Sequence, residues 1–232
     1  MKRLALIPAR GGSKGLPRKN LAVVGGSTLL ERAVTCAIEA AIFDAVVVST
    51  DDPAIAEAGR KAGALVPFLR PRELADDSSP ILTTIHHALV ELEAGGKARF
   101  DLIALLEPTS PRRTPEIVRR VVAAAEEPGT DAALTVSPVP ERFHPLKQFV
   151  NENGRVRHYL PEGVKITRRQ ELTPTYIRNG MCYATRREAL DAGLGVLGSS
   201  AVMVVVPGPV VNIDSMEDLE LARRLLEAES RA

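Results

Sequence analysis

The chain has 232 residues, a length that fits one large α/β domain or one domain with a modest insertion. Its hydrophobic content of 45% is enough for a buried core, and because only 3% of the residues are aromatic, we expect that core to be aliphatic. The formal net charge of +1 argues against a general nucleic-acid-binding protein. Two isolated cysteines and the absence of a long apolar run exclude a disulfide framework and a membrane span, so we expect a reduced, cytoplasmic setting.

Short β-rich segments alternate with helical patterns along most of the chain. Strands are predicted at residues 3–9, 45–49, 65–69, 102–106 and 132–136. Helices are predicted from a capping box at Thr28 to about Ile42, after Asp51-Asp52-Pro53, from Pro80, and around residues 117–122. This alternation predicts an α/β fold, a Rossmann-like arrangement of three layers with a mostly parallel sheet.

The alternation stops between Ser137 and Ile177, where four prolines and a polar turn interrupt it. Residues 148–150 and 156–159 can form a hairpin across that turn. We interpret residues 137–177 as a small extension inserted into a single domain, 1–232. After it, the sequence predicts strands at 181–184 and 202–206 and a last helix that follows Asp214, with Met216, Leu219, Leu225 and Leu226 on its apolar side.

The most informative stretch is IPARGGSKGLPRKN, which immediately follows the first predicted strand. Glycines allow backbone N–H groups to approach phosphate oxygens closely, and the arginines and lysines add positive charge. The spacing matches neither GxxxxGK[ST] nor GxGxxG. The residues by themselves indicate a local anion site, and they leave open a plain surface turn with solvated cations.

Five stretches, in order along the chain, resemble motifs of the acylneuraminate cytidylyltransferases, the CMP-sialic acid synthetase family. They are IPARGGSKGLPRKN, RPRELADD, LEPTSPRR, RQELTPTYIRNGMCY and VNIDSMEDL. The resemblance implies a nucleotidyltransferase that joins a nine-carbon 2-keto sugar acid to CMP, with CTP as donor, pyrophosphate as product, Mg²⁺ as cofactor and a homodimer as assembly. Such a reaction depends mainly on positioning and on charge neutralisation.

The resemblance assigns the nucleotide to the first loop and its surroundings. The residues expected at the nucleotide are Ala9, Arg10, Gly11, Gly12, Ser13, Lys14, Lys19, Asn20 and Arg70. Arg10 and Lys19 are expected to be catalytic, with Lys19 at the α-phosphate. For Arg70, an ion pair with Glu73 or Asp76 is the alternative. Ile81 stands where the family often carries a serine that contacts the nucleotide, and Ser79 and Thr83 flank it.

Asp214 is the third expected catalytic residue and the best candidate for a Mg²⁺ ligand. Asn212 stands where the family carries a second aspartate, so it could offer only an uncharged oxygen. Capping of the last helix is the alternative role for Asp214. Asp51 and Asp52 loosely resemble the metal motif of a glycosyltransferase, but helix capping explains them more simply.

The sugar acid is assigned by resemblance to Glu107, Lys147, Arg169, Asn179, Gly180 and Tyr183. Lys147 and Arg169 match cations that reach the sugar carboxylate from the neighbouring subunit. Sialic acid synthetases commonly carry Gln at the position of Glu107, so we interpret this glutamate as a sign that the sugar differs. The alternatives that stay open are a legionaminic, pseudaminic or Kdo-type acid, GTP as donor, a non-catalytic sugar-nucleotide-binding protein, and a glycosyltransferase.

Overall fold

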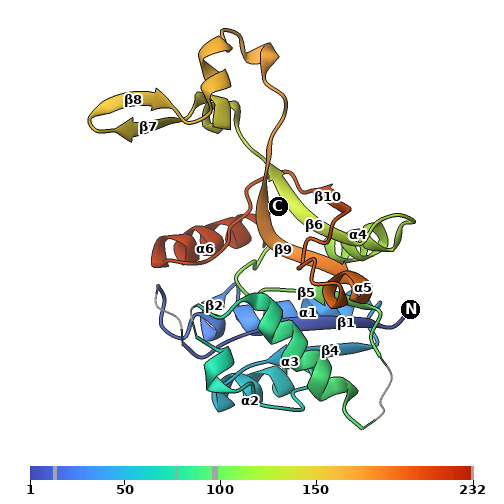
Figure 1. The fold of residues 1–232 in the computed structure, drawn as a ribbon. Helices are drawn as coiled ribbons and strands as arrows, with labels where there is room; N and C mark the ends of the chain where they lie inside the picture. Colours follow the sequence, from blue (N-terminus) through green and yellow to red (C-terminus); the bar gives the residue numbers. More distant parts are fainter. Residues whose placement is uncertain (13–14, 77, 96–98, 231–232) are drawn as a thin grey trace.

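The computed structural model describes residues 1–12, 15–76, 78–95 and 99–230, and a six-stranded sheet lies at its centre (Figure 1). The strand order is β10–β6–β9–β5–β1–β4. The bounds are Arg3–Pro8 for β1, Ala45–Ser49 for β4, Leu102–Leu105 for β5, Ala132–Pro138 for β6, Tyr176–Arg186 for β9 and Ala201–Val205 for β10. Only β9 runs antiparallel to its neighbours, so the prediction of a mostly parallel sheet is confirmed.

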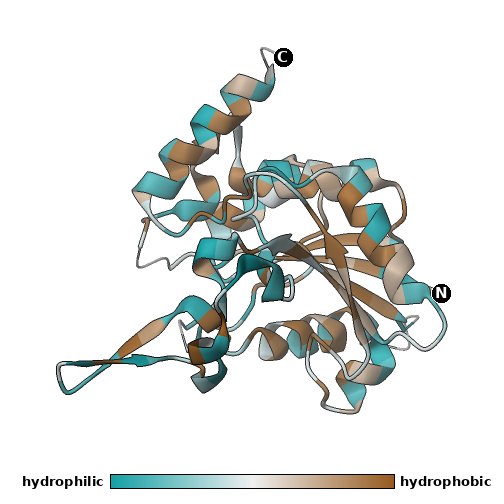
Figure 2. Cartoon of the chain, turned by 90° about the horizontal axis from the view of Figure 1, so that it is seen from above, coloured by the Kyte–Doolittle hydropathy of each residue, from teal (hydrophilic) through white to brown (hydrophobic). Residues whose placement is uncertain are grey.

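Helices cover both faces of this sheet. They are α1 (Leu29–Ala40), α2 (Pro53–Lys61), α3 (Ile81–Glu93), α4 (Pro115–Glu126), α5 (Arg187–Asp191) and α6 (Met216–Ser230). Successive residues of β1 point to opposite faces: Ile7 packs in the cluster built on α1, α2 and α4, whereas Leu6 packs with α3. The strands of this sheet are accordingly mostly apolar, as Figure 2 shows, and the predicted three-layer α/β architecture is confirmed.

The predicted helix starts are confirmed by their caps. Thr28 accepts a hydrogen bond from the N–H of Glu31, and the Glu31 carboxylate accepts one from the N–H of Thr28. Asp52 caps α2 by accepting from the N–H groups of Ala54 and Ile55. These local signals could be read from the sequence because they depend on residues three or four positions apart.

Four details differ from the predictions. Residues 65–69 form no strand; only Leu65 makes a bridge to Val47, because Pro67 lacks the N–H that a ladder needs. The first helix ends at Ala40 rather than Ile42, since Ala41 adopts a left-handed conformation. Met216 is 49% exposed and does not belong to the apolar side of α6. A short hairpin of β2 (Val23–Val24) and β3 (Ser27–Thr28) was not predicted.

The segment between β6 and β9 extends away from the sheet (Figures 1 and 2). Its hairpin consists of β7 (Phe149–Glu152) and β8 (Arg155–His158), as the sequence predicts. His144 fastens the base of this extension, because its ring bonds Thr173 O at 3.0 Å and accepts the N–H of Leu146 at 3.2 Å. None of the helices in the described ranges has the length and apolar character needed to cross a membrane.

Candidate active site

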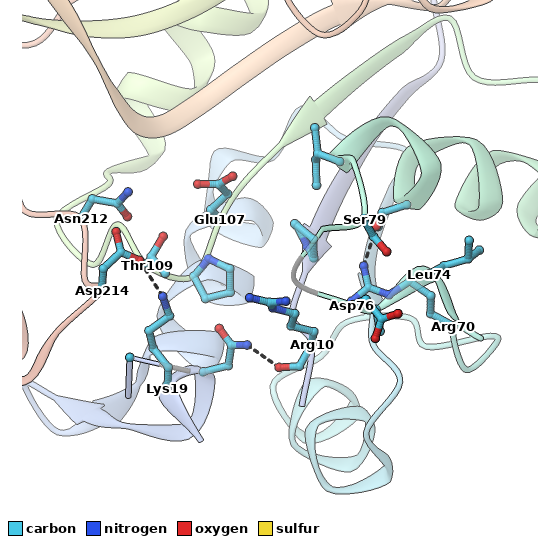
Figure 3. Close-up of a pocket in the computed structure, with 17 residues that line it drawn as sticks. Arg10, Lys19, Arg70, Leu74, Asp76, Ser79, Glu107, Thr109, Asn212 and Asp214 are labelled. Atoms are coloured by element: carbon cyan, nitrogen blue, oxygen red, sulfur yellow. Dashed lines mark hydrogen bonds and ion pairs between the residues drawn. The ribbon is translucent and has the colours of Figure 1, made fainter. Parts of the chain in front are cut away.

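A cleft of about 550 Å³ opens at the carboxyl ends of β1 and β5 (Figure 3). Its lining comprises Pro8, Arg10, Gly15, Lys19, Asn20, Arg70, Leu74, Ala75, Asp76, Ser79, Ile81, Thr84, Glu107, Pro108, Thr109, Asn212 and Asp214. Ligands of open α/β sheets bind at this edge, because loops from several parallel strands meet there. The first glycine-rich loop, the end of β5 and the segment before α6 therefore share one cavity.

Lys19 and Asp214 join the two ends of the chain in this cleft. The Lys19 ammonium lies 2.8 Å from Asp214 Oδ1, and the lysine side chain is mostly buried whereas that of Asp214 is 73% exposed. Leu16 and Ile213, each close in sequence to one member of the pair, pack in one apolar cluster. Gly15 lies directly against the backbone oxygen of Asp214, where a side chain would collide with it. The loop and the C-terminal segment are therefore fitted closely to each other.

Arg10 reaches into the middle of the cleft, and Asn20 supports its backbone (Figure 3). Asn20 Nδ2 donates to Arg10 O at 2.9 Å. The N–H of Gly11 donates to Asp51 Oδ1 at 2.9 Å, so a carboxylate of the protein occupies one of the expected phosphate-binding amides. Ala9 is buried in the core and does not line the cleft. Gly12 has open space around its α-carbon, with no atom within 4 Å of the position of an added methyl group. Ser13 and Lys14 lie outside the described residues.

Arg70 lines the opposite side of the cleft and is only 5% exposed. Its Nη1 donates to Thr84 Oγ1 at 2.6 Å, while its Nε has no hydrogen-bond partner in the described part of the chain. Burial lowers the pKa of Arg70, and the nearby Asp51 carboxylate opposes this shift. The alternative ion pair with Glu73 or Asp76 is not formed among the described residues.

The cleft wall beside Arg70 comes partly from α3. Ser79 and Ile81 line it, so an isoleucine occupies the place where the resemblance implies a serine contact, with the hydroxyl of Ser79 nearby. Thr83 does not line it, and its hydroxyl donates to Pro80 O at 2.7 Å. Thr84 was missed by the sequence analysis. Its spacing of three residues from Ile81 places both on one face of a helix, and that spacing was the available signal.

Glu107 lies at the end of β5, and its carboxyl group faces the cleft. Burial raises its pKa, Asp214 adds to the increase, and Arg113 and Lys19 oppose it. Arg113 is buried and donates to the backbone oxygens of Glu107 and Met181, so it links the segment after β5 to the middle of β9.

The sugar-binding residues predicted on β9 do not all reach the cleft. Asn179 donates to Ser137 Oγ at 3.0 Å and accepts the N–H of Met181, so it shapes the backbone. Tyr183 packs with the α3-side core. Gly180 has a φ of +71° and lies against the side chains of Glu107 and Asn212, next to the cleft. Lys147 and Arg169 are exposed on the extension and do not line the cleft of their own chain.

Asp51 and Asp52 do not line the cleft. Asp52 caps α2, as the sequence favoured over a metal-binding role, but Asp51 does not cap it and instead accepts the N–H of Gly11. Asp214 does not cap α6, which corrects the alternative considered above. Ser215 and Asp218 cap it reciprocally: Asp218 N–H donates to Ser215 Oγ, and Ser215 N–H donates to Asp218 Oδ2 at 2.9 Å.

Comparisons with known proteins agree with this arrangement. The profile of the cytidylyltransferase family matches residues 4–230. The chain belongs to the cytidylyltransferase family. The resemblance to the acylneuraminate cytidylyltransferases that the motifs indicated is thereby confirmed.

Two relatives align with this cytidylyltransferase over almost its whole length. The pseudaminic acid cytidylyltransferase of Campylobacter jejuni is 32% identical and aligns over 97% of this chain and 96% of its own. The CMP-N,N'-diacetyllegionaminic acid synthase of Legionella pneumophila is 30% identical and aligns over 100% of this chain and 99% of its own. A solved structure of CMP:2-keto-3-deoxy-manno-octonic acid synthetase complexed with CTP shares the fold, with a TM-score of 0.74 and 20% identity over 99% of this chain and all of the other.

The donors of the cleft fit Mg²⁺ only in part. Asp214 offers an exposed carboxylate and Asn212 an amide oxygen, both hard ligands of the kind that Mg²⁺ prefers. No group of three or more His, Cys, Asp or Glu side chains in the described ranges could hold a metal ion. The cytidylyltransferase therefore fits an ion that takes most of its ligands from water and from substrate phosphates.

Proposed function

We propose that this cytidylyltransferase uses CTP to activate a nonulosonic acid, a nine-carbon 2-keto sugar acid, and releases the CMP-sugar and pyrophosphate. One observation carries the proposal: Lys19 and Arg10 line the same cleft at the carboxyl edge of the sheet, and Lys19 is paired there with Asp214. Relatives named for pseudaminic and legionaminic acid support the class of sugar, and a neighbour of the same fold in complex with CTP supports the donor.

In this reaction the anomeric hydroxyl of the sugar attacks the α-phosphorus of CTP, and the bond to pyrophosphate breaks. The hydroxyl proton leaves to solvent. Lys19 neutralises the charge that develops on the α-phosphate, because its ammonium is held in place by Asp214 and shielded from water. Arg10 binds the departing pyrophosphate. A Mg²⁺ held by Asp214 and Asn212 would neutralise further charge on the phosphate oxygens.

The nucleoside half of CTP is proposed to lie along the Arg70 side of the cleft. This side presents a buried guanidinium with an unpartnered Nε, the hydroxyl of Ser79 and the apolar side chain of Ile81. An apolar wall with a few fixed polar groups suits a pyrimidine and its ribose. The sugar acid then takes the other end, near Glu107 and Gly180.

Among sugar acids, we favour a pseudaminic- or legionaminic-type acid over N-acylneuraminic acid. An anionic Glu107 accepts hydrogen bonds from a sugar N–H or O–H but repels a carboxylate, so it selects for the substituents of the ring. N-acylneuraminic acid remains the second candidate, because the motif resemblance points to that family.

The extension is proposed to complete the site of a second copy in a homodimer. Lys147 and Arg169 are exposed cations on it, outside the cleft of their own chain. Arginine can meet a carboxylate through two parallel hydrogen bonds, so Arg169 suits the sugar carboxylate.

A screen of pyrophosphate release tests the proposed function. CTP, GTP and UTP are each combined with pseudaminic, legionaminic, N-acetylneuraminic and Kdo acids, with and without Mg²⁺. We expect release with CTP and one nonulosonic acid, and none without Mg²⁺. Nucleotide binding without release from any pair would favour a non-catalytic binding protein instead.

A further inference from the structure

The peptide group that joins Arg10 to Gly11 is held at both of its polar atoms. Its oxygen accepts Asn20 Nδ2 at 2.9 Å, and its N–H donates to Asp51 Oδ1 at 2.9 Å. Because a peptide group is planar, these two bonds fix the orientation of the backbone from which the Arg10 side chain enters the cleft (Figure 3). Asp51 therefore acts on a residue of the cleft without lining the cleft itself.

The turn after β4 that carries Asp51 is itself firmly placed. Thr50 is fully buried, and its hydroxyl accepts the N–H of Asp52 at 3.1 Å. A methyl group on Gly11 would lie 2.8 Å from the Cβ and from the Oδ2 of Asp52, so the loop approaches this turn as closely as glycine allows. The bond from Gly11 to Asp51 is therefore made to a rigid support.

The same turn anchors Arg70, the buried cation on the other side of the cleft. The backbone oxygen of Thr50 accepts the N–H of Arg70 at 2.8 Å. Burial lowers the pKa of Arg70 most, the Asp51 carboxylate opposes this shift, and the charge of Arg10 adds to it. Thr50 and Asp51 thus connect the two arginines that the cleft presents to a nucleotide.

We propose that Asp51 is a positioning residue for nucleotide binding, because its carboxylate fixes the peptide group between Arg10 and Gly11 and so orients Arg10 toward the triphosphate. The inference rests on the proposed function only in taking a nucleoside triphosphate as the ligand of the cleft. Orienting a charged group before the ligand arrives removes part of the entropy cost of binding. Loss of the bond therefore weakens nucleotide binding even though Asp51 does not touch the nucleotide.

The test measures CTP binding by isothermal titration calorimetry, without sugar acid, in two variants of Asp51. Asp51→Ala removes the acceptor of the Gly11 N–H and should raise the Kd for CTP about tenfold or more. Asp51→Asn keeps an oxygen there without the charge, and its Kd should stay within about threefold of that of the starting protein. Asp131→Ala is the matched control, because Asp131 also accepts backbone N–H groups, those of Ser199 and Ser200, and does not line the cleft. This control should leave the Kd unchanged.

Amide hydrogen exchange, followed by NMR, shows whether the effect is local. The Gly11 N–H should exchange about tenfold faster or more in Asp51→Ala, and it should stay protected in Asp51→Asn. The amides of β1 should keep their protection in both variants, whereas a general loss of stability would expose them as well.

Two results for CTP binding would overturn the inference. Unchanged or tighter binding in Asp51→Ala would mean that the nucleotide does not need this bond, or that a phosphate takes over the Gly11 amide. Equal weakening in Asp51→Asn and Asp51→Ala would assign the effect to the charge of Asp51 instead of its bond to Gly11.

The Asn variant decides alone if Asp51→Ala does not fold. It must then keep both the CTP affinity and the protection of the Gly11 N–H, and loss of either contradicts the inference. If no sugar acid supports pyrophosphate release but the CTP series behaves as expected, the proposed function fails and the role of Asp51 stands.

Discussion

The ammonium of Lys19 lies 2.8 Å from the Asp214 carboxylate, although the two residues are 195 positions apart. The pair closes the cleft between the first loop and the segment before α6. In the proposed reaction, an incoming α-phosphate competes with Asp214 for the same ammonium. The ion pair with Asp214 holds the lysine side chain in the cleft before the substrate arrives. This preorganisation underlies the first prediction.

Lys19→Ala should lower kcat by about 10²- to 10³-fold, since a preorganised charge at the transition state is removed. The fold should survive, because the apolar cluster of Leu16 and Ile213 still fixes the loop. Steady-state kinetics and thermal unfolding measure the two effects. The control is Lys61→Ala, whose exposed ammonium on α2 pairs with Glu57. Equal turnover in Lys19→Ala and Lys61→Ala would remove Lys19 from the site.

Arg169→Ala should raise the KM for the sugar acid about tenfold or more and leave the KM for CTP nearly unchanged, because a charged contact to a carboxylate is lost. Arg155→Ala, an exposed arginine on β8 of the same extension, is the control. Mixing Arg169→Ala with Lys19→Ala should recover activity if the extension serves the other subunit. Equal increases in both KM values, or no recovery on mixing, would contradict this role.

The role of Asp52 distinguishes a cytidylyltransferase, in which it only caps a helix, from a glycosyltransferase, in which it would bind a metal ion. Asn caps helices about as well as Asp, so Asp52→Asn should keep both stability and turnover. Asp52→Ala removes the bonds to the N–H groups of Ala54 and Ile55 and should cost about 1 kcal/mol in urea unfolding. Loss of turnover in Asp52→Asn with unchanged stability would instead indicate a metal ligand.

The two cysteines should be unreactive in the folded protein. Burial raises the pKa of Cys182 to about 12, and burial also raises the pKa of Cys36. The pKa of about 12 means that the Cys182 thiol stays protonated through pH 7–10, where thiols of the unfolded chain become reactive thiolates, and the raised pKa of Cys36 lowers its thiolate fraction. Titration with a disulfide reagent checks this. Rapid reaction of both thiols without denaturant would contradict the buried positions.

The sequence was most informative where short-range chemistry decides the structure. The capping box at Thr28, the cap at Asp52 and the β7–β8 hairpin each depend on residues a few positions apart, and all three were predicted. The first loop was located for the same reason, because glycines and cations follow a buried strand directly.

Contacts between distant segments could not be predicted. The bond from Arg70 to Thr84 spans 14 positions, and that from Arg113 to Met181 spans 68. In neither pair does the sequence around one residue indicate which distant residue it will contact. Asn179 and Tyr183 were assigned to the sugar by motif alone, but the direction of each side chain from β9 depends on its pairing with β5 and β6. Asn179 consequently bonds Ser137, and the partly buried Tyr183 packs against the core on the α3 side.

A crystal structure of the protein soaked with CTP and Mg²⁺ tests the central claim most directly. The account predicts that the α-phosphate contacts the Lys19 ammonium, that the Asp214 carboxylate turns to the cation, and that the nucleoside lies along Arg70. A nucleotide bound outside this cleft, or one whose phosphates leave the bond between Lys19 and Asp214 intact, would contradict it.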